Sequence, residues 1–165
     1  MSKTITMTLG ASSIDKAIKE LNAYKKELKR KTEALIDAMV QYGEDYAINA
    51  VGHVRTGETL TSIEGYRKGN VGVIVAGGNA IWLEFGTGVR HNGAAGSSPH
   101  PKGAELGMTI GGYGDGHGAN PGGWWYYDET GLKHTYGIEA NMFMYKTGQE
   151  LRMVFPKLAK EVFGA

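Results

Sequence analysis

Apolar and polar residues near the N-terminus repeat first with the period of a strand and then with that of a helix. Residues 5–9 alternate apolar side chains with threonines, which predicts a short strand with one buried face. Residues 14–50 place apolar side chains at steps of three, four or seven, which predicts a long amphipathic helix. Ser12 or Ser13 is the expected N-cap of this helix, and Gly43 is a candidate site for a kink.

The next segments indicate a hairpin followed by a short helical turn. Residues 60–67 and 71–76 have strand patterns and flank the turn Lys68-Gly69-Asn70, and the valines of the second strand share one face. Residues 80–85 follow Asn79, which can cap a helix, and they predict a single helical turn rather than a strand.

The C-terminal part of the chain predicts a second hairpin and a final helix. Two strand-like runs flank residues 128–131 in "WWYYDETGLKHTYG", and residues 142–163 have helical spacing, with a kink or restart expected at Pro156. Together the elements predict an α+β fold, in which a small antiparallel sheet is packed by a long N-terminal helix and a C-terminal helix. We expect one domain, residues 1–165, with the Gly-rich residues 86–123 inserted in it as a loop or arm.

The composition of the chain excludes several classes of function. Half of the 26 glycines lie in the insertion at residues 86–123, so the high glycine content belongs to one region of the chain. A net charge of +1 provides no overall field that would attract nucleic acid or an anionic membrane. The lack of cysteine excludes disulfide and thiolate chemistry. No apolar run approaches the roughly 20 residues that span a bilayer, so we expect a soluble protein without membrane contact.

One carboxylate, Glu84, stands among large apolar residues in "AIWLEFGTGVR", just before a run of glycines. A general acid would suit that position, but acid–base catalysis normally needs a partner group, and no second carboxylate lies nearby in the sequence. Alternatively, Glu84 accepts hydrogen bonds from backbone amides of the Gly86–Gly88 turn, or pairs with an arginine such as Arg55 or Arg90. We favour this structural or subunit-contact role, which predicts that the Glu84→Gln variant folds but assembles poorly.

Histidines and aspartates in or beside the insertion raise the question of a metal site. No two of these histidines are closer than nine residues, so the closely spaced ligand pair of a typical zinc site is missing. The stretch "GGYGDGHGANPGG" also lacks the strand, the helix and the Gly-Lys-Ser/Thr of a phosphate-binding loop. We expect neither site. The residues considered as metal ligands are His91, His100, His117, His134, Asp115 and Asp128.

Aromatic residues at the start of the second hairpin are candidates for a contact with a partner. Interfaces are enriched in such residues, but an ordinary amphipathic hairpin would also explain them, and both interpretations stay open. These residues are Trp124, Trp125, Tyr126 and Tyr127.

A basic face of the first helix has three interpretations. We expect it to be solvated and partly balanced by pairs such as Lys16–Glu20. A contact with an acidic partner ring ranks second, and a contact with DNA in a channel ranks third. The face comprises Lys16, Lys19, Lys25, Lys26, Lys29, Arg30 and Lys31.

Three motifs, taken in order, resemble the tail-completion or neck proteins of tailed phages, which are minor tail components at the head–tail junction. Thr56-Gly57 lead to Leu60, which comes one residue later than in the Thr-Gly-x-Leu-x-x-Ser-Ile pattern of that family, and then to Ser62 and Ile63. Residues 141–144, Asn-Met-Phe-Met, stand where the family has Pro-Phe at the start of its last helix, so the proline is missing. The family's motif of an aromatic residue before Glu-Phe-Gly-Thr is matched by Trp82, Glu84, Phe85, Gly86 and Thr87.

The resemblance covers most of the chain except the insertion. It implies a structural virion protein of a long-tailed phage, not an enzyme and without cofactors, that forms a ring of six copies at the head–tail junction. Its partners would be other connector or neck proteins and tail-tube or tail-terminator proteins, with DNA only passing through the lumen. The protein would be made in the host cytoplasm and become part of the virion.

From the residues, we expect the matched motif and Thr56-Gly57 to tether turns and contact neighbouring subunits. Two alternatives belong to other classes of protein. One is a small metal-dependent hydrolase that uses the histidines and Glu84, and the other is a basic nucleic-acid-binding module that uses the first helix.

Overall fold

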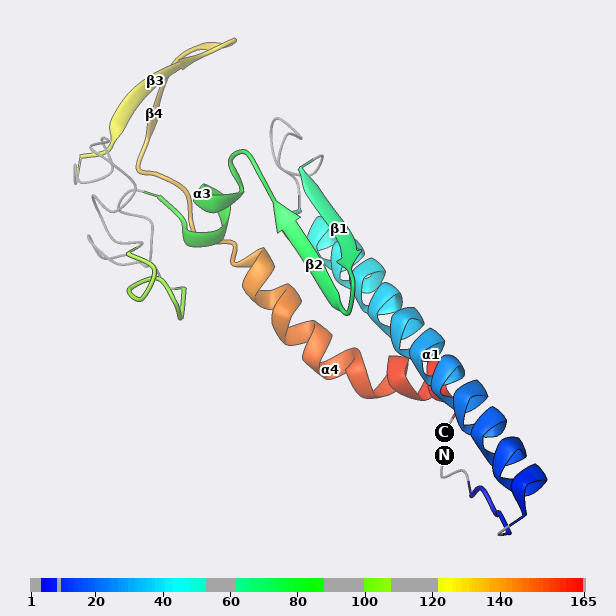
Figure 1. The fold of residues 1–165 in the computed structure, drawn as a ribbon. Helices are drawn as coiled ribbons and strands as arrows, with labels where there is room; N and C mark the ends of the chain where they lie inside the picture. The colour runs from blue at the N-terminus through cyan, green and yellow to red at the C-terminus, as the bar shows by residue number, and fades with distance from the viewer. Residues whose placement is uncertain (1–3, 9, 53–61, 88–99, 108–121, 165) are drawn as a thin grey trace.

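The computed structural model describes residues 4–8, 10–52, 62–87, 100–107 and 122–164 of the chain. These residues form two long helices, one short helix and two antiparallel two-stranded sheets (Figure 1), which confirms the expected α+β fold. The elements are α1 (Ala11–Val51), β1 (Ile63–Lys68), β2 (Val71–Ala76), α3 (Ala80–Phe85), β3 (Trp124–Asp128), β4 (Gly131–Thr135) and α4 (Phe143–Phe163).

The N-terminal residues differ from the strand and the cap that the sequence predicts. Residues 4–8 are not a strand in the structure, and none of the described strands pairs with them. Helix α1 begins at Ala11, before either expected cap, and Gly10 occupies the N-cap position. Ser13 instead accepts a hydrogen bond at its Oγ from the backbone N–H of Thr8, at 2.9 Å.

Gly43 brings α1 close to its neighbours and does not interrupt it. The helix runs without a break over 41 residues. A Cβ at position 43 would overlap the side chain of Ile74 in β2 and press on that of Leu151 in α4. The missing side chain therefore lets α1, β2 and α4 meet at one point.

Strands β1 and β2 form the predicted hairpin. Their antiparallel register runs from Ile63 opposite Ala76 to Lys68 opposite Val71, so the turn has two residues. Gly69 has a φ of 62°, which fits the first central position of a type II′ turn. This turn type matches the twist of the strands it joins.

The two faces of this hairpin have different surroundings. Alternate residues of β2 face α1, because a Cβ at Gly72 would press on Val40 and the Ile74 side chain reaches Gly43. The valines of β2 share the opposite face, as the sequence predicts, and Val71 is 60% exposed there. The valine face is thus the outer face of the hairpin.

The buried core is small and lies where α1, β1, α3 and α4 meet. Partly buried apolar residues from β2 and the ends of the helices surround it. Helix α4 contains Pro156, and Figure 1 shows that its axis changes direction near its C-terminal end. The core residues are Ala47, Val51, Ile63, Ala80 and Phe143.

Two parts of the molecule extend beyond this core, at opposite ends of the view in Figure 1. The hairpin of β3 and β4, also predicted, projects at one end with Trp125 and Tyr127 64% and 80% exposed. At the other end, α1 continues past the C-terminus of α4, where Lys31 Nζ donates to the Phe163 carbonyl oxygen at 3.3 Å. Beyond that point the apolar stripe of α1 is exposed, at Ile14, Ile18, Leu21 and Leu28.

Candidate functional site

Glu84 is buried where α3 meets the first turn of α4, with 6% of the residue exposed. The chain turns immediately after α3, at Gly86, whose φ is 76°. A Cβ at Gly86 would collide with the backbone of Ile138 and Ala140, so the glycine permits this close approach. Thr87 then makes two hydrogen bonds with Ile138. The Thr87 N–H donates to the Ile138 carbonyl oxygen at 2.9 Å, and Thr87 Oγ1 accepts from the Ile138 N–H at 3.1 Å.

The Glu84 carboxylate caps helix α4 from a distant part of the chain. Its Oε2 accepts the Met144 N–H at 2.8 Å, and its Oε1 accepts the Tyr145 N–H at 2.9 Å. Amides of the first helical turn have no partner within the helix, and a negative charge at this end interacts favourably with the helix dipole. Glu84 therefore stabilises the start of α4.

His100 completes the site from within the Gly-rich insertion. Its Nδ1 accepts the backbone N–H of Lys102 at 3.0 Å, so the ring hydrogen is assigned to Nε2. Nε2 lies 3.0 Å from Glu84 Oε1 and donates to it. The buried ring contacts Phe85 and Tyr145, at 4.4 and 5.3 Å between ring centroids. The insertion is thus attached to the folded body at this point.

The insertion is therefore not one uniform arm. Residues 100–107 form turns, and His100 and Gly103 are buried. The contact at His100 therefore attaches one described part of the predicted loop or arm to the folded body.

Among the described residues, the hydrogen-bond partners of Glu84 differ from those expected from the sequence. The Gly86 N–H donates to the Trp82 carbonyl oxygen at 2.9 Å, and the Thr87 N–H is taken by Ile138. Gly88, Arg55 and Arg90 lie outside the described residues, as do Thr56 and Gly57 of the first motif. The expected kind of contact, a carboxylate bound to backbone amides, is present with amides of another segment.

Sequence reasoning missed both His100 as a partner and α4 as the capped helix. A signal existed at the start of α4, because Met142 stands at the N-cap with a φ of 57° and has no side-chain acceptor. A helix without its own cap needs an acceptor from elsewhere. The sequence alone does not say which acceptor that is.

The arrangement joins three segments through one carboxylate and one imidazole. Both carboxylate oxygens accept hydrogen bonds, and both ring nitrogens of His100 are engaged. Within the described part of the chain, no group of three or more His, Cys, Asp or Glu side chains could hold a metal ion.

The other residues considered as metal ligands lie apart from this site. The Nε2 of His134 is 2.8 Å from the Gly122 carbonyl oxygen, and Asp128 accepts from the Thr130 N–H at 2.8 Å in the turn between β3 and β4. His91, His117 and Asp115 lie outside the described residues.

The basic face of α1 is exposed and partly paired. Arg30 donates to Glu27 at 2.7 and 2.9 Å, and this hydrogen bond lowers the pKa of the Glu27 carboxyl. Lys29 lies 3.9 Å from Glu33. The expected Lys16–Glu20 pair is not among the ion pairs of the residues that the structure describes.

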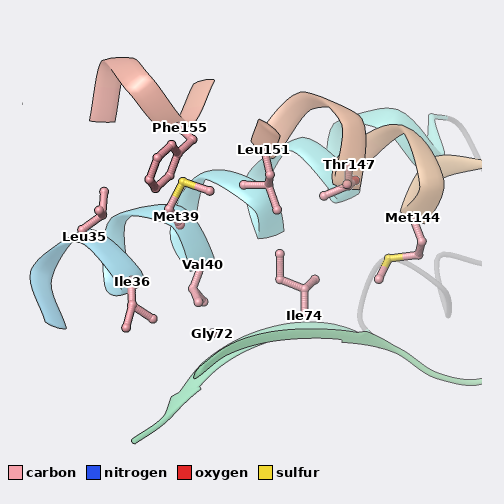
Figure 2. Close-up of a pocket in the computed structure, with 11 residues that line it drawn as sticks. Leu35, Ile36, Met39, Val40, Gly72, Ile74, Met144, Thr147, Leu151 and Phe155 are labelled. Carbon is pink, nitrogen blue, oxygen red and sulfur yellow. The ribbon is translucent and has the colours of Figure 1, made fainter. Parts of the chain in front are cut away.

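An apolar groove of about 420 Å³, here called the central groove, lies between α1, α4 and β2. Figure 2 shows side chains from all three elements pointing into it. A second hollow, of about 530 Å³, continues from it past Ile74 and Met144 to Glu84 and His100. The central groove is lined by Leu35, Ile36, Met39, Val40, Gly72, Ile74, Met144, Thr147, Gly148, Leu151 and Phe155.

No helix of the described residues is both long and apolar enough to cross a membrane. Comparisons of the chain with protein-family models, with curated proteins and with solved structures found no match.

Proposed function

We propose that this protein is a structural component of the neck of a long-tailed phage, and that its copies form a closed ring at the head–tail junction. One observation carries the proposal: both oxygens of the Glu84 carboxylate in the resembling motif accept structural hydrogen bonds, while many large apolar side chains of the described residues are exposed. A site of this kind fixes the shape of a subunit. Uncovered apolar surfaces need a partner.

The third matched segment lies in contact with the second, which supports reading the motifs together. The Asn141 N–H donates to the Leu83 carbonyl oxygen at 2.7 Å, and the Met142 N–H donates to that of Glu84 at 3.2 Å. The segment that stands in place of Pro-Phe is therefore held against the Glu-Phe-Gly-Thr motif.

The positions of the uncovered surfaces favour a ring over a two-fold dimer. The β3–β4 hairpin and the N-terminal half of α1 lie at opposite ends of the subunit in Figure 1, and each exposes large apolar side chains. Two different surfaces suit head-to-tail contacts between identical chains, and such contacts form closed rings when their rotation closes. DNA would pass through the lumen of such a ring.

Native mass spectrometry and negative-stain electron microscopy of the purified protein test this proposal. We expect a ring, of six copies on the family resemblance, formed alone or on mixing with connector and tail-tube proteins of the same virion. A protein that stays monomeric under all of these conditions would overturn it. Retention of zinc after dialysis, or DNA binding that weakens steeply with salt, would support the hydrolase or the nucleic-acid-binding module instead.

A further inference from the structure

Strand β2 has one backbone edge with which no described strand pairs. In an antiparallel pair, alternate residues direct their N–H and C=O groups to the partner strand and the others direct them away. The Gly77 N–H donates to the Ser62 carbonyl oxygen at 3.4 Å, which continues the β1–β2 register and assigns the odd-numbered residues of β2 to the ladder. The groups of Gly72, Ile74 and Ala76 therefore point away from β1, and no hydrogen bond between described residues engages them.

The central groove lies beside that edge. Gly72 and Ile74 form one side of it, α4 forms the other, and Leu35 and Met39 of α1 form its floor. In Figure 1, β2 lies between β1 and α4, so its free edge is turned towards α4. An added strand would find backbone partners on β2 and an apolar floor beneath it.

Residues 4–8 have the sequence of such a strand but pair with no strand among the described residues of their own copy. They read Thr-Ile-Thr-Met-Thr, and Met7 is 63% exposed. At about 3.3 Å per residue they span roughly 16 Å, which suits the six residues of β2. If Ile5 and Met7 faced the floor of the groove, the threonines would face outwards beside the valines of β2.

The reach of the chain shows that these residues cannot fill the groove of their own copy. Leu35, the groove residue nearest the start of α1, lies 24 residues after Ala11, which is about 36 Å at 1.5 Å per residue. Thr4 precedes Ala11 by seven residues and reaches at most about 25 Å from it. A strand centred on Thr6 reaches only about 18 Å. An occupant with this sequence must come from a second copy.

We propose that residues 4–8 of one copy add to the free edge of β2 in a neighbouring copy and occupy its central groove. The inference rests on the proposed function for the closed ring, and it names the contact that links successive copies. Each copy gives a strand to one neighbour and receives one from the other, which is a head-to-tail contact.

The charges of α1 complement each other in this arrangement. From Ala11 to Arg30 the helix has six basic and three acidic residues, whereas from Lys31 to Val51 it has one basic and four acidic residues. The second half forms the floor of the groove. A strand placed there brings the basic half of α1 in the donor copy towards the acidic half of α1 in the receiving copy. This attraction favours the head-to-tail contact between the two copies.

Thiol cross-linking tests the contact directly, because the chain has no cysteine of its own. Copies with Thr6→Cys are assembled with copies of another tag length that contain Gly148→Cys, and a short thiol-to-thiol cross-linker is added. Thr6 is the centre of the strand, so the result does not depend on strand direction. Gly148 lines the groove, and a Cβ there has open space around it.

The matched control replaces Gly148→Cys by Lys146→Cys, which is also exposed on α4 but does not line the groove. We expect the mixed product to be at least about tenfold more abundant with Gly148→Cys than with Lys146→Cys. Equal yields, or no mixed product, in particles of unchanged mass would overturn this inference and leave the ring in place. A monomeric parent protein would overturn both proposals.

Removal of residues 1–8 provides an independent check. We expect the shortened chain to keep the circular dichroism of the full chain, since α1 begins later, and to lose the oligomer at concentrations where the full chain assembles. An oligomer of unchanged mass would contradict the proposed strand exchange.

Discussion

Glu84 shows how one buried carboxylate can hold together parts of a chain that lie far apart in sequence. It accepts hydrogen bonds from two amides of α4 and from His100, which come 60, 61 and 16 residues after it. A charged acceptor gives stronger hydrogen bonds than a neutral one. Loss of this group would therefore loosen α3, α4 and the insertion together.

The Glu84→Gln variant tests this role. An amide in place of the carboxylate keeps one acceptor oxygen but turns an NH₂ group towards another donor, either a backbone N–H of α4 or His100 Nε2–H. We expect the free energy of unfolding to fall by about 1–3 kcal/mol, measured by chemical denaturation followed by circular dichroism. The variant should still fold and should assemble less well.

The exposed residue Glu105 provides the matched control, because it lies in the same inserted segment as His100. Glu105→Gln should leave the unfolding curve unchanged. If both variants unfold like the parent protein, Glu84 does not stabilise the start of α4.

The sequence indicated the character of this site but could not identify its partners. A carboxylate among apolar residues, next to glycines, predicted an acceptor of backbone amides, and the structure has Glu84 in such a contact. Spacing along a chain says little about contacts between residues that are tens of positions apart. From the sequence, His100 is therefore a candidate only as a metal ligand, and Arg55 and Arg90 are candidate partners of Glu84 because of their positive charge.

Elements with a strong hydrophobic period and hairpins of consecutive strands could be predicted, whereas contacts between elements far apart in sequence could not. The long helix, both hairpins and the turn at Ala80–Phe85 agree with the predicted ranges to within a few residues. Residues 4–8 were predicted as a strand because their pattern has a period of two, but a strand also needs a partner. Gly43 was expected to bend α1 because spacing does not show how closely another element approaches.

The contact between α1 and α4 includes one hydrogen bond that titrates. Tyr42 Oη donates to Glu150 Oε1 at 2.9 Å. This hydrogen bond raises the pKa of Tyr42 above its ordinary value of 10.0, with smaller effects from burial and from the charge of Glu150. The protonated tyrosine is therefore favoured in the folded state, so its contribution to stability is complete below pH 10 and is lost as the pH rises through the raised pKa.

The Tyr42→Phe variant tests the sign of this effect. We expect it to be less stable than the parent protein at pH 7, because Glu150 loses its donor, and the difference should shrink above pH 10. Chemical denaturation curves of both proteins, recorded at pH 7 and at several pH values above 10, give the difference in stability at each pH. Tyr66→Phe, at an exposed position, is the control, and a difference for Tyr42→Phe that does not change with pH would contradict the assignment.

At the scale of the whole molecule, the subunit exposes more large apolar side chains than its small core buries. Eight apolar residues are buried among those described, and many larger ones on α1, β2, the β3–β4 hairpin and α4 are exposed. Large exposed apolar patches often mark sites of association, and the proposed assembly would cover these side chains. The interface role of the aromatic hairpin remains a prediction that a variant can test.

A double substitution in that hairpin separates association from folding. Tyr127 and Leu132 are cross-strand partners, 80% and 50% exposed. Replacing both by serine should change the free energy of unfolding by less than about 0.5 kcal/mol. On the proposed function, it should also reduce the fraction of protein in larger particles, alone or with the proposed virion partners. Sedimentation velocity measures that fraction, and Lys133→Ser is the control. If assembly is unchanged, the β3–β4 hairpin is not part of the proposed interface between copies.

The overhanging half of α1 has a mechanical consequence. Between Ala11 and Lys31 the helix runs about 30 Å at 1.5 Å per residue. If this half of α1 moved as a rigid rod about the point where α4 ends, a tilt of about 5° would displace the N-terminal end of the helix by roughly 3 Å at that length. In the proposed ring, a slight change of angle within one subunit would therefore displace the tip of α1 relative to the adjoining subunit.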